Sequence, residues 1–212
     1  GIAEAMRKPR AKVYFAGAGL QEIGLQHGGM EIAESYELDE MCCWTQRANF
    51  EHPVRQCDLT QKLAADEPDA DAMCFSYPCQ RYSAIGDLHG VRTGDEMFLH
   101  ALRLMALRPP EVYSVENGTG MLMVPVVIEA IARLPGYHVQ VHCPVRSELW
   151  LPQRRDRLII LGSRRPFAWR PPVARRRVKL AEILERDPRV RIPDYVYKRM
   201  RGEYRDLPII SD

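Results

Sequence analysis

Short apolar segments alternate with amphipathic segments along most of this chain of 212 residues. Apolar runs rich in β-branched and aromatic residues occur at residues 13–16, 73–75, 112–115, 137–142 and 158–161. Patterns with helical spacing lie between them, at about residues 20–27, 41–49, 96–107 and 121–133. Strands that alternate with helices predict an α/β fold, in which helices cover both faces of a mostly parallel sheet.

The regular pattern weakens after Gly162. Residues 164–179 are rich in Pro and Arg, and two short helical patterns follow at 180–185 and 195–201. A chain of this length suits a single well-formed core. We expect three parts, namely an N-terminal extension or cloning remnant at residues 1–11, one folded domain at 12–163, and a basic linker with short helices at 164–212.

The composition is that of an ordinary globular protein, with 46% hydrophobic and 27% charged residues. No apolar run approaches the roughly 20 residues that a membrane-spanning helix needs, so we expect no membrane partner. No secretion signal is visible, and none of the six cysteines belongs to a CxxC pair. We therefore expect no bound metal, no disulfide and a reducing, intracellular location.

The net charge of +2 hides an asymmetry along the sequence. Residues 1–145 hold 12 Lys and Arg against 19 Asp and Glu, whereas residues 146–212 hold 18 against 9. In the second part 16 of the 18 basic residues are arginine, whose planar guanidinium suits phosphate. This pattern favours a surface that faces a polyanion, with a merely solvated basic face as an alternative of equal weight.

A glycine-rich turn follows the first apolar run, in the sequence FAGAGLQEIG. Gly17 and Gly19 let the backbone approach a ligand closely, and the N–H groups at a helix start attract a carboxylate or phosphate. Glu37 ends a second apolar run 18 residues after Gly19, where nucleotide-binding folds have an acid that binds ribose hydroxyls. The turn therefore indicates a nucleotide-like ligand, and an ordinary tight turn is the alternative.

A thiol comes shortly after another apolar run, in the sequence AMCFSYPCQRYS. Cys79 is either a buried thiol that ends a strand or a nucleophile at the carboxyl edge of the sheet. Open α/β sheets bind their ligands at that edge.

Six short sequences, taken in order, resemble motifs of the cytosine-C5 methyltransferase family. They are FAGAGL, Glu37, CDLT, YPCQRYS, VEN and LPQRRDR, which are similar to motifs I, II, III, IV, VI and VIII. The resemblance covers about residues 12–162. It implies the Rossmann-like class I fold of S-adenosylmethionine-dependent methyltransferases, and the activity of a DNA (cytosine-5-)-methyltransferase. For Cys79, the resemblance also favours the role of nucleophile over that of a buried thiol.

The same resemblance implies catalytic roles for four residues. Cys79 matches the cysteine that attacks C6 of cytosine, and Glu116 matches the glutamate that engages N3 and the exocyclic amine. Arg155 and Arg157 match the arginines that bind the base carbonyl oxygen and a neighbouring phosphate. Thiolate addition at C6 makes C5 able to accept a methyl group, and a carboxyl group at N3 eases that addition. Further substrate contacts are expected from Gln80, Ser83, Asn117 and Gln153.

S-adenosylmethionine is the implied cofactor. The family has an aromatic residue against the adenine, a glycine turn near the methionine moiety, an acid on the ribose and an acid on the adenine amine. Phe15, Gly17 with Gly19, Glu37 and Asp58 match these features in that order. The full set of expected cofactor-binding residues is Phe15, Gly17, Gly19, Glu37, Leu38, Asp58, Leu59 and Pro78.

Target recognition is the part of the family pattern that we do not find in this sequence. The residues after Gly162 show no recognisable target-recognition domain and no motif IX or X. We therefore expect a second polypeptide or a further C-terminal segment to supply it. Double-stranded DNA is the expected partner, in the cytoplasm of a bacterium or of a phage-infected cell. An RNA (tRNA) cytosine-C5 methyltransferase, a subunit of a split enzyme and a non-catalytic regulatory homologue remain alternatives.

Overall fold

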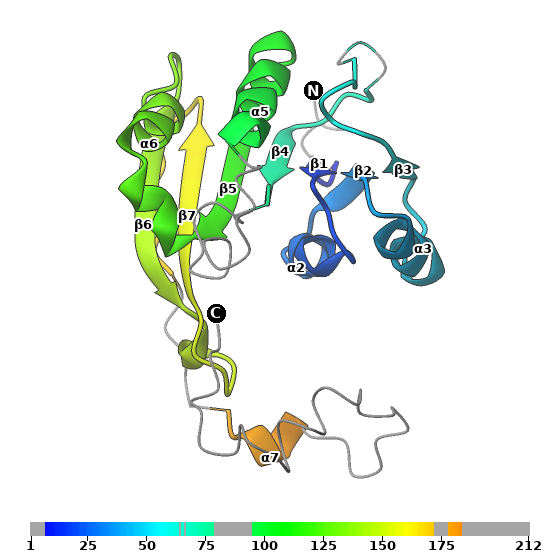
Figure 1. Cartoon of the computed structure of the whole chain (residues 1–212), viewed down its shortest axis with the longest axis vertical. Helices are drawn as coiled ribbons and strands as arrows, with labels where there is room; N and C mark the ends of the chain where they lie inside the picture. The colour runs from blue at the N-terminus through cyan, green and yellow to red at the C-terminus, as the bar shows by residue number, and fades with distance from the viewer. Residues whose placement is uncertain (1–6, 64, 66, 79–94, 172–177, 184–212) are drawn as a thin grey trace, which may run out of the picture. The chain divides into compact units, whose positions relative to one another are not determined.

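The computed structural model describes residues 7–63, 65, 67–78, 95–171 and 178–183. Its centre is a seven-stranded sheet with the order β3-β2-β1-β4-β5-β7-β6 (Figure 1). The pairs from β3 to β5 are parallel, and β7 runs antiparallel to β5. The expectation of a mostly parallel sheet is confirmed. The strands are β1 (Arg10–Tyr14), β2 (Glu31–Glu37), β3 (Val54–Gln56), β4 (Ala72–Phe75), β5 (Val112–Gly118), β6 (His138–Arg146) and β7 (Asp156–Ser163).

Successive residues of the central strands point into two different cores. Val13 and Cys74 belong to a small cluster on one face, whereas Tyr14 and Phe75 belong to a larger cluster on the other. The ring of Tyr14 stacks on those of Tyr36 and Phe75, with centroids 4.9 and 4.7 Å apart. β1 and β4 are therefore buried on both faces, as the apolar runs at residues 13–16 and 73–75 predict.

Among the described residues, α2 and α3 cover one face of the sheet, and α5 and α6 cover the other (Figure 1). Leu25 of α2 (Leu20–His27) packs on the smaller cluster, and α3 (Glu40–Asn49) contacts β2 and β3 beside it. On the opposite face, α5 (Asp95–Leu107) and α6 (Pro125–Ala132) bury their apolar stripes in the larger cluster. Helices on both faces were expected. Short turns join the carboxyl ends of β1 and β2 to α2 and α3, whereas a longer connection, residues 57–71, leads from β3 to β4.

The helix expected at residues 121–133 is divided. A 3-10 turn, η2 (Thr119–Met123), comes first, and α6 starts at Pro125. Proline lacks the N–H that an interior helix position needs, but it is favoured in the first helical turn. Pro125 therefore begins a new helix instead of continuing the earlier turn.

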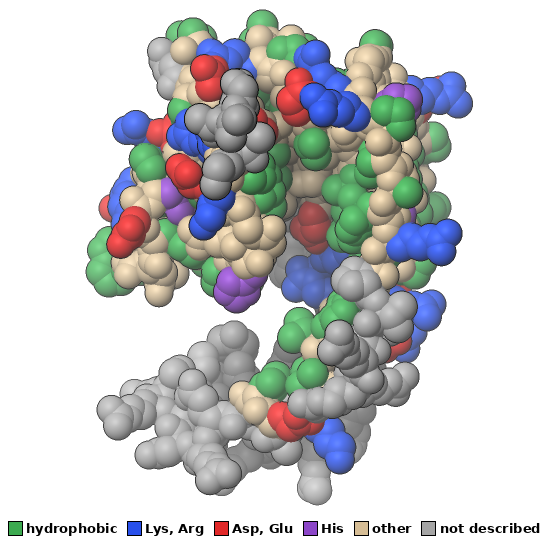
Figure 2. All heavy atoms as spheres, turned by 180° about the vertical axis from the view of Figure 1, so that it is seen from behind, with side chains coloured by type: hydrophobic (Ala, Val, Ile, Leu, Met, Phe, Trp, Pro, Cys, Tyr) green, Lys and Arg blue, Asp and Glu red, His purple; other side chains and the backbone are tan. Residues whose placement is uncertain are grey.

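The chain divides into two compact units, and each is described by itself. The first contains residues 1–145 and 156–171, and the second contains residues 146–155 and 172–212. Residues 146–155, expected within the folded domain, thus group with the second unit, where η3 (Ser147–Leu149) and α7 (Leu180–Ile183) lie. On the face in Figure 2, basic and acidic side chains of the described residues are interspersed.

Candidate functional site

The turn after β1 has three residues with a left-handed backbone. The φ angle is 58° at Phe15, 56° at Gly17 and 96° at Gly19. This conformation is ordinary for glycine, but it costs a residue with a side chain about 1–2 kcal/mol. Strain of this kind gathers at ligand sites, and the turn lies at the carboxyl edge of the sheet, where α/β folds bind ligands.

Gly19 lies too close to α3 for any side chain. A Cβ atom there would lie 2.4 Å from Cε2 of Phe50 and 3.2 Å from Cγ of Gln46. Gln46 is fully buried and donates a 2.6 Å hydrogen bond from Nε2 to the carbonyl oxygen of Gly17. The glycine turn is therefore held by α3, and Gly19 is required for this close approach.

Gly19→Ala is expected to lower the free energy of unfolding by about 2–4 kcal/mol, from left-handed strain plus overpacking against Phe50. Gly24, inside α2, is the matched control, because a Cβ there would meet nothing within 4 Å. Gly24→Ala is expected to stabilise the protein by about 0.5–1 kcal/mol. Urea unfolding measures both values, and equal effects at the two glycines would contradict the role of the close packing.

Glu37 ties the glycine turn to the end of β2. One carboxylate oxygen accepts the N–H of Gly17 at 2.7 Å, and the other accepts those of Leu38 and Asp39 at 2.7 and 2.9 Å. A carboxylate has about four lone-pair sites, so these three bonds leave about one for a ligand. Leu38, next along the chain, is 63% exposed. Glu37, which we expect to bind the ribose, is thus held at the edge of the sheet by its hydrogen bonds to Gly17, Leu38 and Asp39.

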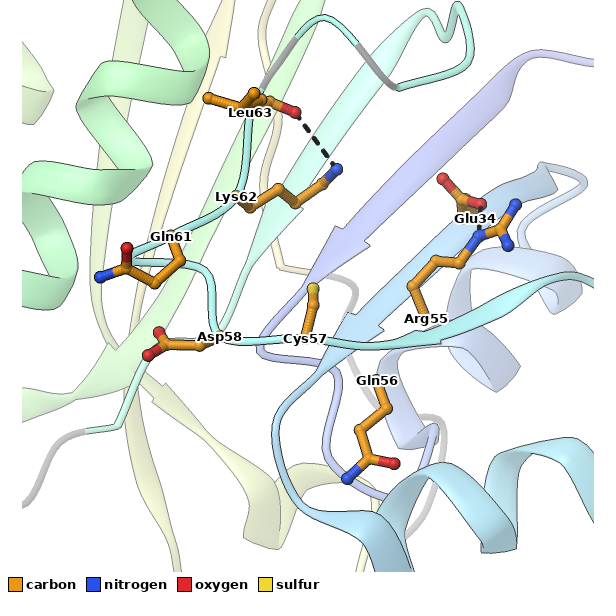
Figure 3. A pocket seen from close by; sticks show the side chains of 8 residues that line it. All are labelled: Glu34, Arg55, Gln56, Cys57, Asp58, Gln61, Lys62 and Leu63. Carbon is orange, nitrogen blue, oxygen red and sulfur yellow. Dashed lines mark hydrogen bonds and ion pairs between the residues drawn. The ribbon is translucent and has the colours of Figure 1, made fainter.

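β3 leads into a loop that carries Asp58 and Leu59 beside the end of β2. Thr60 donates its N–H to Oδ1 of Asp58 at 2.9 Å, and hydrogen bonding by Thr60 holds the pKa of this carboxyl below its usual value. Leu59 is buried in the larger core. Residues of β2, β3 and this loop line a cavity of about 620 Å³ (Figure 3). This volume is within the range of small-molecule sites.

A buried polar cluster joins α2 to β2. Glu22 and Ser35 are both 0% exposed. Ser35 Oγ donates to Oε1 of Glu22 at 2.8 Å and lies 2.9 Å from Nε2 of His52. Burial raises the pKa of the Glu22 carboxyl, and the nearby Glu37 charge raises it further. Burial also lowers the pKa of His52. The cluster fixes the first turn of α2, and thereby the glycine turn before it.

Glu22→Gln is expected to make stability less dependent on pH. A carboxyl whose pKa is raised on folding contributes stability that is fully present below its unfolded pKa and is lost as pH rises through the folded pKa. Glutamine still accepts from Ser35 but has no charge to bury, so the variant is expected to lack this loss. Free energies of unfolding between about pH 4 and pH 8 test this window. Parallel curves for the two proteins would contradict it.

Two of the three charged residues that we expect near the cytosine base, Glu116 and Arg157, lie together. Arg157 on β7 forms an ion pair with Glu116 on β5, with Nε 2.9 Å from Oε1. The antiparallel register pairs Arg157 with Gly118, so the two side chains are diagonal neighbours on one face. Their side chains are 18% and 40% exposed, which leaves the carboxylate open to solvent on one side.

Asn117 connects the end of β5 to the segment after β4. Its side chain is buried, donates from Nδ2 to the carbonyl oxygen of Tyr77 at 3.3 Å, and accepts the N–H of Gly118 at 2.8 Å. Pro78, which follows Tyr77, is exposed. Three expected site residues lie outside the described residues, namely Cys79, Gln80 and Ser83.

Gln153 and Arg155 belong to the second unit, whereas Glu116 and Arg157 belong to the first. Both side chains are exposed, and Ser147 binds their backbone, with Oγ 2.7 Å from the Gln153 oxygen and N 3.0 Å from the Arg155 oxygen. Their roles stay predictions.

Gln46 is a site residue that the sequence analysis missed. Its only signal in the sequence is its spacing, three residues after the buried Cys43 on the same helix. A polar side chain on the apolar stripe of a helix requires a partner inside the protein, and here the partner is the glycine turn.

No group of three or more His, Cys, Asp or Glu side chains that could hold a metal ion occurs among the described residues. Within the same part of the chain, no helix is long and apolar enough to cross a membrane.

Comparison with known proteins identifies relatives along most of the chain. Type II methyltransferase M.BsuFI of Bacillus subtilis is 30% identical over 156 residues, which are 70% of this chain and 37% of that protein. Type II methyltransferase M.AquIA of Picosynechococcus sp. is 28% identical over 173 residues, 71% of this chain and 70% of that protein. The chain thus spans well under half the length of the first relative and a larger share of the second.

The fold is also shared with solved structures. The Entamoeba histolytica methyltransferase EhMeth aligns with a TM-score of 0.68 at 17% identity, over 92% of this chain and 66% of that one. The family profile described as C-5 cytosine-specific DNA methylase matches residues 14–203. This match includes the glycine turn, Glu37, Asp58 and the Glu116–Arg157 pair. The chain therefore belongs to the C-5 cytosine-specific DNA methylase family.

Proposed function

We propose that the protein transfers a methyl group from S-adenosylmethionine to C5 of cytosine in DNA. The observation that carries this proposal is the Glu116–Arg157 ion pair at the carboxyl end of β5. Asn117, beside it, holds the segment that leads directly to Cys79. This arrangement supports the proposal, because addition of a thiolate to a pyrimidine ring needs a carboxyl group and a cationic donor close to the base.

The described residues fit S-adenosylmethionine as cofactor, which supplies an electrophilic methyl group when bound. Glu37 retains an acceptor site at the end of β2, suited to a ribose hydroxyl. Asp58, held ionised by Thr60, offers an acceptor to an amino group. A Cβ on Gly17 would meet nothing within 4 Å, so a ligand has room to approach the backbone there.

In the proposed mechanism the Cys79 thiolate forms a bond to C6 of a flipped-out cytosine, and the ring electrons become available at C5. Glu116 holds a proton at N3 and so offsets the charge that this addition creates. Arg157 donates to the base carbonyl oxygen, where charge also develops. Once C5 has gained the methyl group, S-adenosylhomocysteine remains as the other product. Transfer of the C5 proton to water then returns electrons to the ring and breaks the C6–sulfur bond, which restores the Cys79 thiolate.

Target recognition is proposed to require residues beyond those assigned above, from a second polypeptide or from a further segment. The support is that this chain corresponds to only part of M.BsuFI. Double-stranded DNA in a bacterial cytoplasm is the proposed setting, and the arginine-rich part after residue 146 is proposed to contact phosphates.

Methyl transfer from labelled S-adenosylmethionine tests the function. Unmethylated DNA and unmodified tRNA are offered separately, and Cys79→Ser is the control. Label in DNA that disappears with Cys79→Ser is the expected result. Label in tRNA alone would replace DNA by RNA as substrate. Cofactor binding without label in either polymer would contradict an autonomous enzyme and favour a subunit or a regulatory homologue.

A further inference from the structure

The loop after β3 is attached to the sheet at its start and to α5 further on. The N–H of Cys57 donates to the carbonyl oxygen of Glu37 at 2.8 Å. The N–H of Gln61 donates to the carbonyl oxygen of Asp58 at 3.0 Å, which closes a turn. Figure 3 shows Asp58 and Gln61 pointing to the same side, away from the Glu34–Arg55 ion pair. Asp58 lies between these attachments, so its direction depends on how both are held.

Arg103 of α5 makes the second attachment. Its Nη1 donates to the carbonyl oxygen of Lys62, and its Nη2 donates to that of Leu59, both at 3.0 Å. Its Nε is buried and has no hydrogen-bond partner among the described residues. Both terminal nitrogens of Arg103 thus bind carbonyl groups of one loop. One side chain of α5 therefore holds both ends of the segment from Leu59 to Lys62.

We propose that Arg103 is a positioning residue that directs Asp58 to the amino group of the adenine, and so sets the preference of the site for adenine. This inference rests on the proposed function, because it takes Asp58 as the acceptor of that amino group. A guanidinium has fixed, forked donors, whereas a lysine ammonium is a single point of attachment. Only the fork fixes both carbonyl groups, and therefore the plane of the loop, at once.

Arg108 supplies a matched control, because it holds another part of the same connection from β3 to β4. Its Nη2 lies 2.6 Å from Oδ1 of Asp69 and 3.3 Å from the carbonyl oxygen of Glu67. Both arginines come from α5 or its C-terminal end and both bind this connection. Only Arg103 binds the segment next to Asp58.

The experiment compares two ligands on the full chain by calorimetry. S-adenosylhomocysteine has an amino group at C6 of the purine, and S-inosylhomocysteine has a carbonyl oxygen there, which faces Asp58 unfavourably. Wild type is expected to bind the adenine compound about 10- to 100-fold more tightly, the effect of one hydrogen bond to a charged group. In Arg103→Met this ratio is expected to fall to about 3-fold or less. Arg108→Met is expected to keep the wild-type ratio.

Arg103→Lys is the second variant, because it keeps the charge and most of the side-chain volume. It is expected to lose most of the preference as well, while thermal unfolding confirms that it is folded at the assay temperature. A wild-type ratio in folded Arg103→Met or Arg103→Lys would overturn the proposal, as would an equal loss in Arg108→Met. Wild type that binds neither ligand would overturn the proposed cofactor site, and the role of Arg103 with it.

Discussion

Glu116→Gln is expected to lower the rate constant of methyl transfer by about 10²- to 10⁴-fold, the range of a lost general acid–base group. Glutamine has nearly the same shape, but it carries no exchangeable carboxyl proton for N3 of the base. It also gives up the ion pair with Arg157, whose Nε lies 2.9 Å from the carboxylate. Single-turnover transfer from labelled S-adenosylmethionine to a cytosine-containing duplex measures the rate constant. Cofactor affinity, measured separately, is expected to stay near that of wild type.

Glu129→Gln is the control for this experiment. Glu129 is an exposed glutamate that pairs with Arg133 at 2.9 Å on α6, away from the end of β5. The Glu129→Gln variant is expected to transfer the methyl group at the wild-type rate. Loss of an exposed pair of this kind changes stability by only about 0.3–0.5 kcal/mol, so the variant is expected to stay folded. If Glu116→Gln also retained the wild-type rate, the proposed protonation at N3 would be wrong, whatever the substrate polymer.

Glu67→Met is expected to lower the free energy of unfolding by about 3–5 kcal/mol. Oε2 of Glu67 lies 2.7 Å from Nζ of Lys12, and the two side chains are 0% and 3% exposed. Tyr14 donates to the same oxygen. Removal of the carboxylate leaves the Lys12 ammonium buried without its closest opposite charge. The free energy lost in this way is expected to exceed the free energy gained from the packing of the methionine side chain. Urea unfolding at neutral pH measures the change.

Two further variants separate the buried pair from an ordinary surface pair. Asp69→Ala removes the partner of Arg108, but the Asp69 side chain is 98% exposed, so a change of about 0–1 kcal/mol is expected. The double variant Lys12→Met/Glu67→Met removes the closest buried pair and is expected to recover much of the lost stability. Lys62, whose Nζ lies 3.7 Å from Oε1 of Glu67, still loses that partner, so the recovery is expected to be incomplete. A double variant as unstable as Glu67→Met would show that the ion pair is not the cause.

β1 and β4 were predictable because burial on both faces makes much of their sequence apolar. β5 was also expected from an apolar run, although it buries only alternate residues. β2 is harder to recognise, because it buries Glu34 and Ser35, whose partners come from other elements. β3 has only three residues, and two of them are exposed and polar. Its existence depends on pairing with β2, which no local pattern records.

The candidate site was predictable where chemistry is tied to the ends of strands. Glu37 was expected at the end of an apolar run, and it ends β2. Glu116 was expected just after the run at residues 112–115, and it lies near the end of β5. Asp58 was expected from the resemblance alone, and it lies two residues after β3. The contacts that orient them were not predictable. Gln46 reaches across 29 residues to the glycine turn, and Arg103 reaches across 44 residues to Leu59. Partners so distant along the chain leave no periodic signal, because only the folded sheet brings them together.

In the proposed ribose-binding role of Glu37, the three N–H bonds that it accepts also restrict which nucleotides the site can bind. The carboxylate is fixed against the backbone and cannot rotate away from a ligand. The carboxylate can accept a hydrogen bond from a hydroxyl group, but it repels an anion at the same distance. With Glu37 in the proposed role, adenosine compounds that carry a phosphate group on the 2′ or 3′ oxygen are expected to bind weakly, because their charge repels the carboxylate. The same carboxylate would then keep such phosphorylated nucleotides from competing for the site.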